Sequence, residues 1–224
     1  MPWIDVREPY AAVPVVHDPT ATEALRGILR SSGGEHRFDD VVLDGGQADL
    51  GTHAGLVLES SMIRNLVLCP DEPVELDASW CAFSHCDLSR ADVHRLRASR
   101  LSDCKFVGTD FSDADVVDVV FERCVLSLTN LRMARFSRVS FEHCTLRDLD
   151  AFELVATDVS FDGSELDKVN VDRLKATRVD LRHAKSLQLE AVGRLEGFLV
   201  TEHQLPGLVY QLAFAAGLGV ERDG

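Results

Sequence analysis

Residues 104–188 read, in groups of five, CKFVG TDFSD ADVVD VVFER CVLSL TNLRM ARFSR VSFEH CTLRD LDAFE LVATD VSFDG SELDK VNVDR LKATR VDLRH AKSLQ. The third residue of every group up to Leu181 is apolar, and the first is small or apolar. A period of five matches neither the 3.6 residues per turn of a helix nor the two-residue alternation of a strand. A fixed period of this kind predicts a solenoid, in which each unit stacks on its neighbours to bury a continuous core.

A second period of 20 residues lies within the first. Cys104, Cys124 and Cys144 are 20 residues apart. The same spacing separates Val119, Val139, Val159 and Val179, and also Phe121, Phe141 and Phe161. Like residues that recur every four groups predict that four groups complete one turn, with equivalent residues stacked. We therefore expect a four-sided β-helix with columns of Leu, Phe and small residues inside.

The groups also carry a recognisable tripeptide, as in Ala91-Asp92-Val93, Thr109-Asp110-Phe111 and Thr129-Asn130-Leu131. In this respect the sequence resembles the pentapeptide-repeat family, whose pattern is A-(D/N)-L-x-x. The resemblance implies an all-β fold, a right-handed quadrilateral β-helix with short N-terminal and C-terminal capping helices.

Composition is compatible with a buried core, since 46% of the 224 residues are hydrophobic. The first residues show no basic region followed by an apolar run, so we expect no signal peptide. No apolar segment approaches the ~18 residues of a membrane span. The six cysteines show no C-x-x-C spacing. We therefore expect a cytoplasmic protein whose inward cysteines pack as small hydrophobic residues.

Three segments are predicted. Residues 1–35 form an N-terminal arm and a capping helix, because Thr20-Ala21-Thr22-Glu23 fits a capping box and apolar residues follow at helical spacing. Residues 36–188 form the pentapeptide-repeat β-helix. Residues 189–224 form a C-terminal strand and a helix that acts as a cap or a dimerisation element.

Two irregularities interrupt the β-helix. The group 71–75 places Pro73 at the inward position, where a strand ladder disfavours proline, so we expect this group to bulge outward. Between Val93 and Leu101 the spacing is eight where ten was due. A deletion of two residues explains the spacing and stacks Cys86 beneath Cys104. An insertion of three residues fits the arithmetic equally well but loses that column.

The C-terminal segment predicts a strand within 195–200 and a helix from Pro206 to about Ala216, ended by Gly217. One apolar stripe contains Leu205, Leu208, Val209, Leu212 and Ala216, and a second contains Tyr210, Phe214 and Leu218. A helix that only closed the β-helix would need one stripe. Either both stripes are buried within the monomer, or the second meets its copy across a two-fold axis. The resemblance to MfpA-type members of the family implies the second alternative, a homodimer.

We find no catalytic motif and expect no enzyme, no cofactor and no metal site. No Gly-x-Ser-x-Gly, P-loop or His-Glu-x-x-His sequence is present. His143 and Cys144 are adjacent, but the register turns Cys144 inward and His143 outward, so the two cannot share an ion. His143 and His183 would lie two turns apart, about 9.6 Å, which is too far for both to bind one metal ion.

Surface charge is the main functional clue, because the formal net charge is −14. The predicted face centred on Phe111, Leu131, Ala151 and Val171 presents Asp110, Asp113, Asp150, Glu153 and Asp172 against Arg132 and Arg173. The next face presents Arg135, Arg138, Lys175 and Arg178 against three aspartates. The charge is therefore polarised around the circumference.

The MfpA/Qnr-type members of the family imply a function: a non-enzymatic rod that mimics DNA and binds DNA gyrase or another type II topoisomerase, modulating it or protecting it from quinolones. The five acidic residues of the first face would then be the partner-binding residues. Residues 36–188 contain 27 acidic and 18 basic side chains, under half the charge density of duplex DNA. The alternative is a general protein-interaction scaffold whose acidity keeps it soluble.

Overall fold

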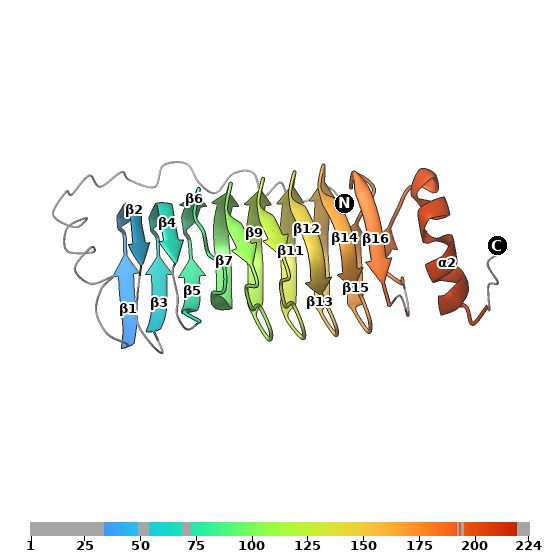
Figure 1. The fold of residues 1–224 in the computed structure, drawn as a ribbon, viewed down its shortest axis with the longest axis horizontal. Helices are drawn as coiled ribbons and strands as arrows, with labels where there is room; N and C mark the ends of the chain where they lie inside the picture. Colours follow the sequence, from blue (N-terminus) through green and yellow to red (C-terminus); the bar gives the residue numbers. More distant parts are fainter. Residues whose placement is uncertain (1–33, 49–53, 69–72, 192, 194, 219–224) are drawn as a thin grey trace.

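The structure is a computed structural model that describes residues 34–48, 54–68, 73–191, 193 and 195–218. These residues form a β-solenoid of about eight turns, with one helix at its C-terminal end (Figure 1). The predicted N-terminal arm and capping helix, up to residue 33, lie outside the described residues.

The strands stack in parallel columns along the solenoid. One column contains β1 (Gly34–Asp39), β3 (Ala54–Glu59), β5 (Glu75–Ser79), β7 (Asp92–Ser102), β9 (Asp115–Glu122), β11 (Arg135–Glu142), β13 (Val155–Asp162), β15 (Lys175–Asp180) and β17 (Phe198–Leu199). A second contains β2 (Val42–Ala48), β4 (Met62–Leu68) and β6 (Ala82–Ser84), and joins the second half of β7. A third contains β8 (Lys105–Val107), β10 (Val125–Ser127), β12 (Thr145–Asp150), β14 (Glu165–Asn170) and β16 (Ser186–Glu190).

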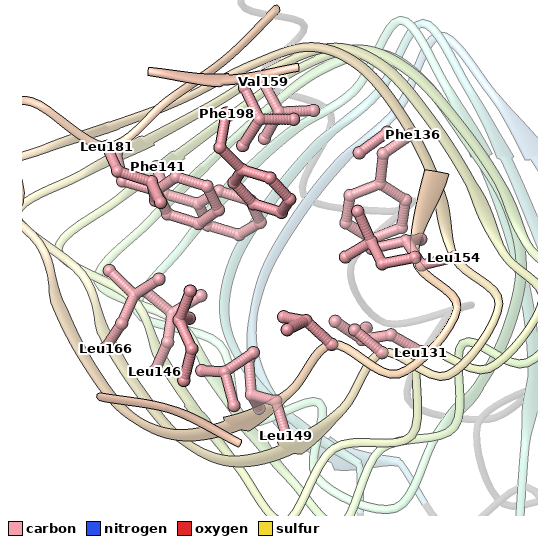
Figure 2. Close-up of a pocket in the computed structure, with 18 residues that line it drawn as sticks. Leu131, Phe136, Phe141, Leu146, Leu149, Leu154, Val159, Leu166, Leu181 and Phe198 are labelled. Atoms are coloured by element: carbon pink, nitrogen blue, oxygen red, sulfur yellow. The ribbon is translucent and has the colours of Figure 1, made fainter. Parts of the chain in front are cut away.

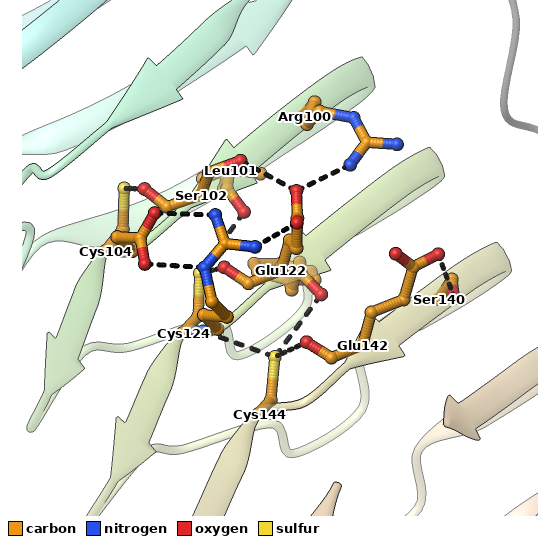
Figure 3. Close-up of polar contacts among 12 residues, drawn as sticks. Arg100, Leu101, Ser102, Cys104, Glu122, Cys124, Ser140, Glu142 and Cys144 are labelled. Carbon is orange, nitrogen blue, oxygen red and sulfur yellow. Dashed lines mark hydrogen bonds and ion pairs between the residues drawn. The ribbon is translucent and has the colours of Figure 1, made fainter. Parts of the chain in front are cut away.

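The predicted 20-residue turn is confirmed by the strand register. Phe106 pairs with Leu126 and Leu126 with Leu146. The cysteines stack as expected, and the Cys124 amide donates to the Cys144 sulfur at 3.4 Å (Figure 3). Each thiol also meets backbone carbonyls, as when Cys104 Sγ donates to the Ser102 oxygen at 3.2 Å. The column therefore satisfies its own polar groups inside the core.

The two-residue deletion is also confirmed. Phe83 pairs with Leu101, which is 18 residues later, and Asp87 pairs with Lys105. At the other irregularity Pro73 is exposed, while Val74 is fully buried and takes the inward position. Near the C-terminal end one extra residue enters the turn, because Leu166 pairs with Leu187 rather than with Ser186.

The corners of the solenoid hold many residues with positive φ, among them Asp113, Met133, Glu153 and Arg173. Non-glycine residues adopt this conformation at some cost, so the stacked hydrogen bonds must hold it in place. The predicted acidic face is built mainly of turns joined by isolated bridges, such as Asp110 to Asn130. The other faces are built mainly of regular strands.

A cavity of about 50 Å³ lies in the core of the last turns and is lined only by apolar side chains (Figure 2). Phe121, Phe141 and Phe161 stack along the core with 4.9 and 5.0 Å between successive ring centroids, and Phe141 and Phe161 line the cavity. Ala151 and Ala156 occupy inward positions one turn after Leu131 and Phe136. Because these two alanine side chains are smaller than Leu131 and Phe136, they do not fill the core and a cavity remains. Phe198 from β17 forms part of its wall.

The C-terminal end follows the predicted order of strand, turn and helix. After β17 come a 3₁₀ helix, η1 (Glu202–Gln204), and α2 (Leu205–Ala215), with proline in its first turn. Gly217, with φ of 76°, follows the helix. Helix α2 contacts β16 and extends the row of strands at one end of the molecule (Figure 1).

Candidate interaction surfaces

The structure brings the five predicted partner-binding residues onto one surface, which we call the acidic face. It comprises the outward residues of the turns centred on Phe111, Leu131, Ala151 and Val171. Asp110 and Asp150 have a local structural role as well. Asp110 Oδ1 accepts the Ser112 amide at 2.7 Å, and Asp150 Oδ1 accepts the Phe152 amide at 3.2 Å. Such Asx turns explain why Asp or Asn recurs at this position.

Two of the five carboxylates are neutralised by arginines of neighbouring turns. Arg132 Nη1 lies 2.8 Å from Asp150 Oδ2, and Arg173 Nη1 lies 3.1 Å from Glu153 Oε1. Both guanidinium groups also stack on the ring of Phe152, with centroid distances of 4.4 Å for Arg132 and 5.5 Å for Arg173. The middle of the acidic face is therefore an island in which an aromatic ring lies between two arginines whose charges are compensated by Asp150 and Glu153.

The other three carboxylates, those of Asp110, Asp113 and Asp172, form no ion pair within the described part of the chain. The negative charge continues towards the N-terminal end, where the backbone of Asp92 pairs with that of Asp110 in an isolated β-bridge. Burial raises the pKa of Asp92; His94 opposes the rise, and the carboxylate of Asp110 adds to it. The net negative charge of this face thus lies on both sides of the island.

The neighbouring face, centred on Val116, Phe136, Ala156 and Ala176, carries ion pairs between successive turns. Arg138 Nη2 lies 2.7 Å from Asp118 Oδ2, and Arg178 pairs with Asp158 in the same way. These side chains are partly or largely exposed, so solvent screens each pair and its contribution to stability is small. Most acidic residues of this face are therefore already compensated.

Six of the seven predicted dimerisation residues lie on α2 and Leu218 lies just beyond it; only one of the seven is buried. Leu208 is 1% exposed and faces the end of the solenoid. The others are exposed: Leu205, Val209, Tyr210, Leu212, Phe214 and Leu218, with Phe214 at 78% and Leu218 at 61%. No charged residue occurs between Leu205 and Leu218. Apart from Leu208, the described chain leaves the large side chains of the two apolar stripes exposed, so a large apolar surface remains open at this end.

The buried thiols are not placed for chemistry. Burial raises the pKa of Cys81 to about 11, and a hydrogen bond with Cys124 raises the pKa of Cys104 to about 12. His143 is exposed while Cys144 is buried, as the register predicted. Within the described ranges no three His, Cys, Asp or Glu side chains are arranged to hold a metal ion. None of the described helices is long and apolar enough to cross a membrane.

Sequence reasoning missed two residues of the acidic face. Phe152 occupies an outward position that is polar in most turns, and Met133, at 43% exposure, occupies a corner. The departure of each residue from the polar pattern of the outward positions was the available signal. Counting charges alone passed over both.

Comparison with known proteins identifies the repeat. Residues 94–171 match the family described as "Pentapeptide repeat region". No curated protein sequence matches the chain. Among solved structures, full-length QnrB1, a plasmid-mediated fluoroquinolone resistance protein, is 16% identical with a TM-score of 0.35, over 80% of this chain and 99% of QnrB1. HetL, a pentapeptide repeat protein involved in heterocyst differentiation regulation from the cyanobacterium Nostoc sp., is 14% identical with a TM-score of 0.23, over 74% of this chain and 90% of HetL.

Proposed function

Because this chain is a pentapeptide-repeat protein, we propose that it acts without catalysis, as a rod whose acidic face docks on a basic, DNA-binding surface of another protein. The partner we propose is DNA gyrase or another type II topoisomerase. The observation that carries the proposal is a set of carboxylates on one side of the rod, those of Asp110, Asp113 and Asp172, which have no ion pair among the described residues.

The charge is sufficient for partial mimicry of DNA only. About eight turns at ~4.8 Å give a rod of ~38 Å, and duplex DNA of that length carries roughly 22 charges. The repeat region has 27 acidic and 18 basic residues, and many of the acids are paired with arginine. We therefore propose that one face, rather than the whole circumference, resembles DNA to its partner.

A variant of the acidic face tests this proposal. Asp113 and Asp172 are changed to Lys, and Asp110 to Asn, because Asn130 shows that asparagine keeps the Asx turn at this position. Asp150 and Glu153 are left intact, since reversing them would set Lys against Arg132 and Arg173. The matched control makes the same change in net charge elsewhere: Glu142→Lys, Asp162→Lys and Glu165→Gln, none of which has an ion pair among the described residues.

The measurement is a gyrase supercoiling assay, with and without a fluoroquinolone, titrated with each protein. We expect the wild type and the control to inhibit supercoiling or to relieve drug inhibition below micromolar concentration, and the acidic-face variant to lose the effect. Equal loss in both variants would indicate nonspecific charge attraction. Inertness of the wild type, with no binding to any type II topoisomerase, would overturn the proposed partner.

The second candidate function is a protein-interaction scaffold without DNA mimicry. The arginine pairing across turns favours it, because those pairs reduce the free negative charge of the rod. This candidate predicts that a partner captured by the wild type is still captured by the acidic-face variant. Retention of binding by that variant would therefore favour the scaffold.

We further propose that α2 joins two copies across a two-fold axis. Exposed apolar surface of this extent marks an interaction site in soluble proteins, and the helix lies at one end of the rod (Figure 1). Changing Tyr210 and Phe214 to Ser should convert a dimer into a monomer in light scattering. Leu199→Ser, at an exposed apolar residue off the helix, should leave the dimer intact. A wild type that is monomeric at micromolar concentration would refute the dimer.

A further inference from the structure

The acidic face contains a feature that a DNA duplex lacks. Phe152 is half-buried between the guanidinium groups of Arg132 and Arg173, and Met133 lies beside it, its amide donating to the Phe152 carbonyl at 2.9 Å. Both cation–π contacts in the described part of the chain use this ring. We call Arg132, Met133, Phe152 and Arg173 the island.

Stability does not explain Met133 at its position. Its φ is 58°, a conformation that favours glycine, asparagine or aspartate over a bulky residue. The side chain is 43% exposed, so it gains little from burial in the monomer. The corner residues of the adjacent turns, Asp113 and Glu153, are charged. An apolar side chain among them is suited to contact with a partner.

The surroundings of the island have the arrangement of a protein-binding hot spot. Hot spots place aromatic and arginine side chains at the centre and polar residues around them. Here the carboxylates of Asp110 and Asp113, which form no ion pair with the part of the chain described, lie one turn before Met133, and Asp172 lies beside Arg173. The three turns between Asp113 and Asp172 span ~14 Å, about the length of four residues of an extended chain.

We infer that the island contributes most of the binding energy of the acidic face. It binds a basic segment of a partner protein in which an apolar side chain lies between two lysine or arginine residues of that segment. The carboxylates would attract the cations by charge complementarity, while Phe152 and Met133 would contact the apolar side chain. This inference rests on the proposed function of the acidic face. It adds that charge alone does not select the partner.

Two synthetic peptides provide the probe: Lys-Lys-Phe-Leu-Lys-Lys, and Lys-Lys-Gly-Ser-Lys-Lys with the same charge. Fluorescence anisotropy measures the binding of each to the full chain. We expect the apolar peptide to bind the wild type about tenfold more tightly, as burial of one apolar side chain allows. Raising the salt concentration should reduce the affinity of the Gly-Ser peptide more than that of the Phe-Leu peptide, because the Gly-Ser peptide binds only through electrostatic attraction.

Variants assign the effect to the island. Phe152→Ala with Met133→Ser should bring the two peptides within twofold of each other. Trp80→Ser, which removes an exposed aromatic residue from another corner, should leave the tenfold ratio unchanged. Asp110→Asn with Asp113→Lys and Asp172→Lys should weaken both peptides in the same proportion.

Equal binding of both peptides by the wild type, or a tenfold ratio that survives in the Phe152 and Met133 variant, would overturn the inference. If the double variant does not fold, Met133→Ser alone, at an exposed corner, serves in its place. It should reduce the ratio of the two peptide affinities below that of the wild type. The peptides contain no topoisomerase, so their result is separate from the supercoiling assay. Peptide discrimination with an inert supercoiling assay would retain the island and reject the proposed partner.

Discussion

The apolar cavity in the last turns predicts that Ala156→Val stabilises the protein. Ala156 is 3% exposed, lines the cavity and lies in β13, where a β-branched residue is well tolerated. Valine adds two carbon atoms to the wall of an empty space (Figure 2). The added side chain should therefore gain contacts without displacing its neighbours.

The magnitude follows from the cavity volume. An unfilled cavity costs about 24 cal/mol per Å³, so 50 Å³ corresponds to about 1.2 kcal/mol. Two buried carbon groups at about 0.8 kcal/mol each give about 1.6 kcal/mol, which agrees. For a chain of this size we expect Tm to rise by about 2–5 °C.

Urea and thermal unfolding followed by circular dichroism measure the effect. Ala134→Val is the matched control, because Ala134 is fully buried but does not line the cavity. Overpacking there should cost about 1–3 kcal/mol. The reasoning fails if Ala156→Val destabilises the protein, and it also fails if both variants stabilise it equally, since that would indicate β-propensity rather than filling of the cavity.

Three more predictions concern the backbone and the thiols. Gly197 has φ of 84°, and a Cβ there would lie 2.2 Å from the Ala176 oxygen, so Gly197→Ala should lower the free energy of unfolding by more than about 2 kcal/mol. The control is Gly207→Ala in α2, where nothing lies within 4 Å of the added Cβ, and it should change the free energy of unfolding by less than about 1 kcal/mol. Equal effects of the two substitutions in urea unfolding would contradict the close approach at Gly197. In a Cys69→Ser background the five buried thiols should react with a thiol reagent only on unfolding. The raised pKa of Cys81 stabilises the fold below pH 9, and this contribution should decline between pH 9 and about 11 as the unfolded thiol ionises first; a Cys81→Ser variant with the same alkaline decline would argue against this cause.

The repeat was predictable because its signal is local and redundant. Each group of five repeats an inward apolar residue, and like residues recur every 20, so the register of Phe106, Leu126 and Leu146 could be read directly. The deletion after Val93 could be chosen over an insertion because it preserved the cysteine column. The extra residue before Leu187 was marked only by the polar Ser186 at the expected inward position, and the strand pairing shows that Leu187 replaces it.

The acidic face was predictable as a set of positions but not as an electrostatic surface. The sequence alone determines which side chains share a face, since that follows from the period. Whether Asp150 and Glu153 are free depends on how Arg132 and Arg173 reach across turns, and this was decided by the tertiary structure.

The four-sided solenoid, its columns and the polarity of its circumference could be predicted from the amino-acid sequence, because backbone register follows from a regular repeat. The pairing of the carboxylates, the stacking of Phe152, the cavity beside Ala156 and the exposure of α2 became apparent only in the three-dimensional structure. These depend on side-chain reach and volume between neighbouring turns, which the repeat does not encode.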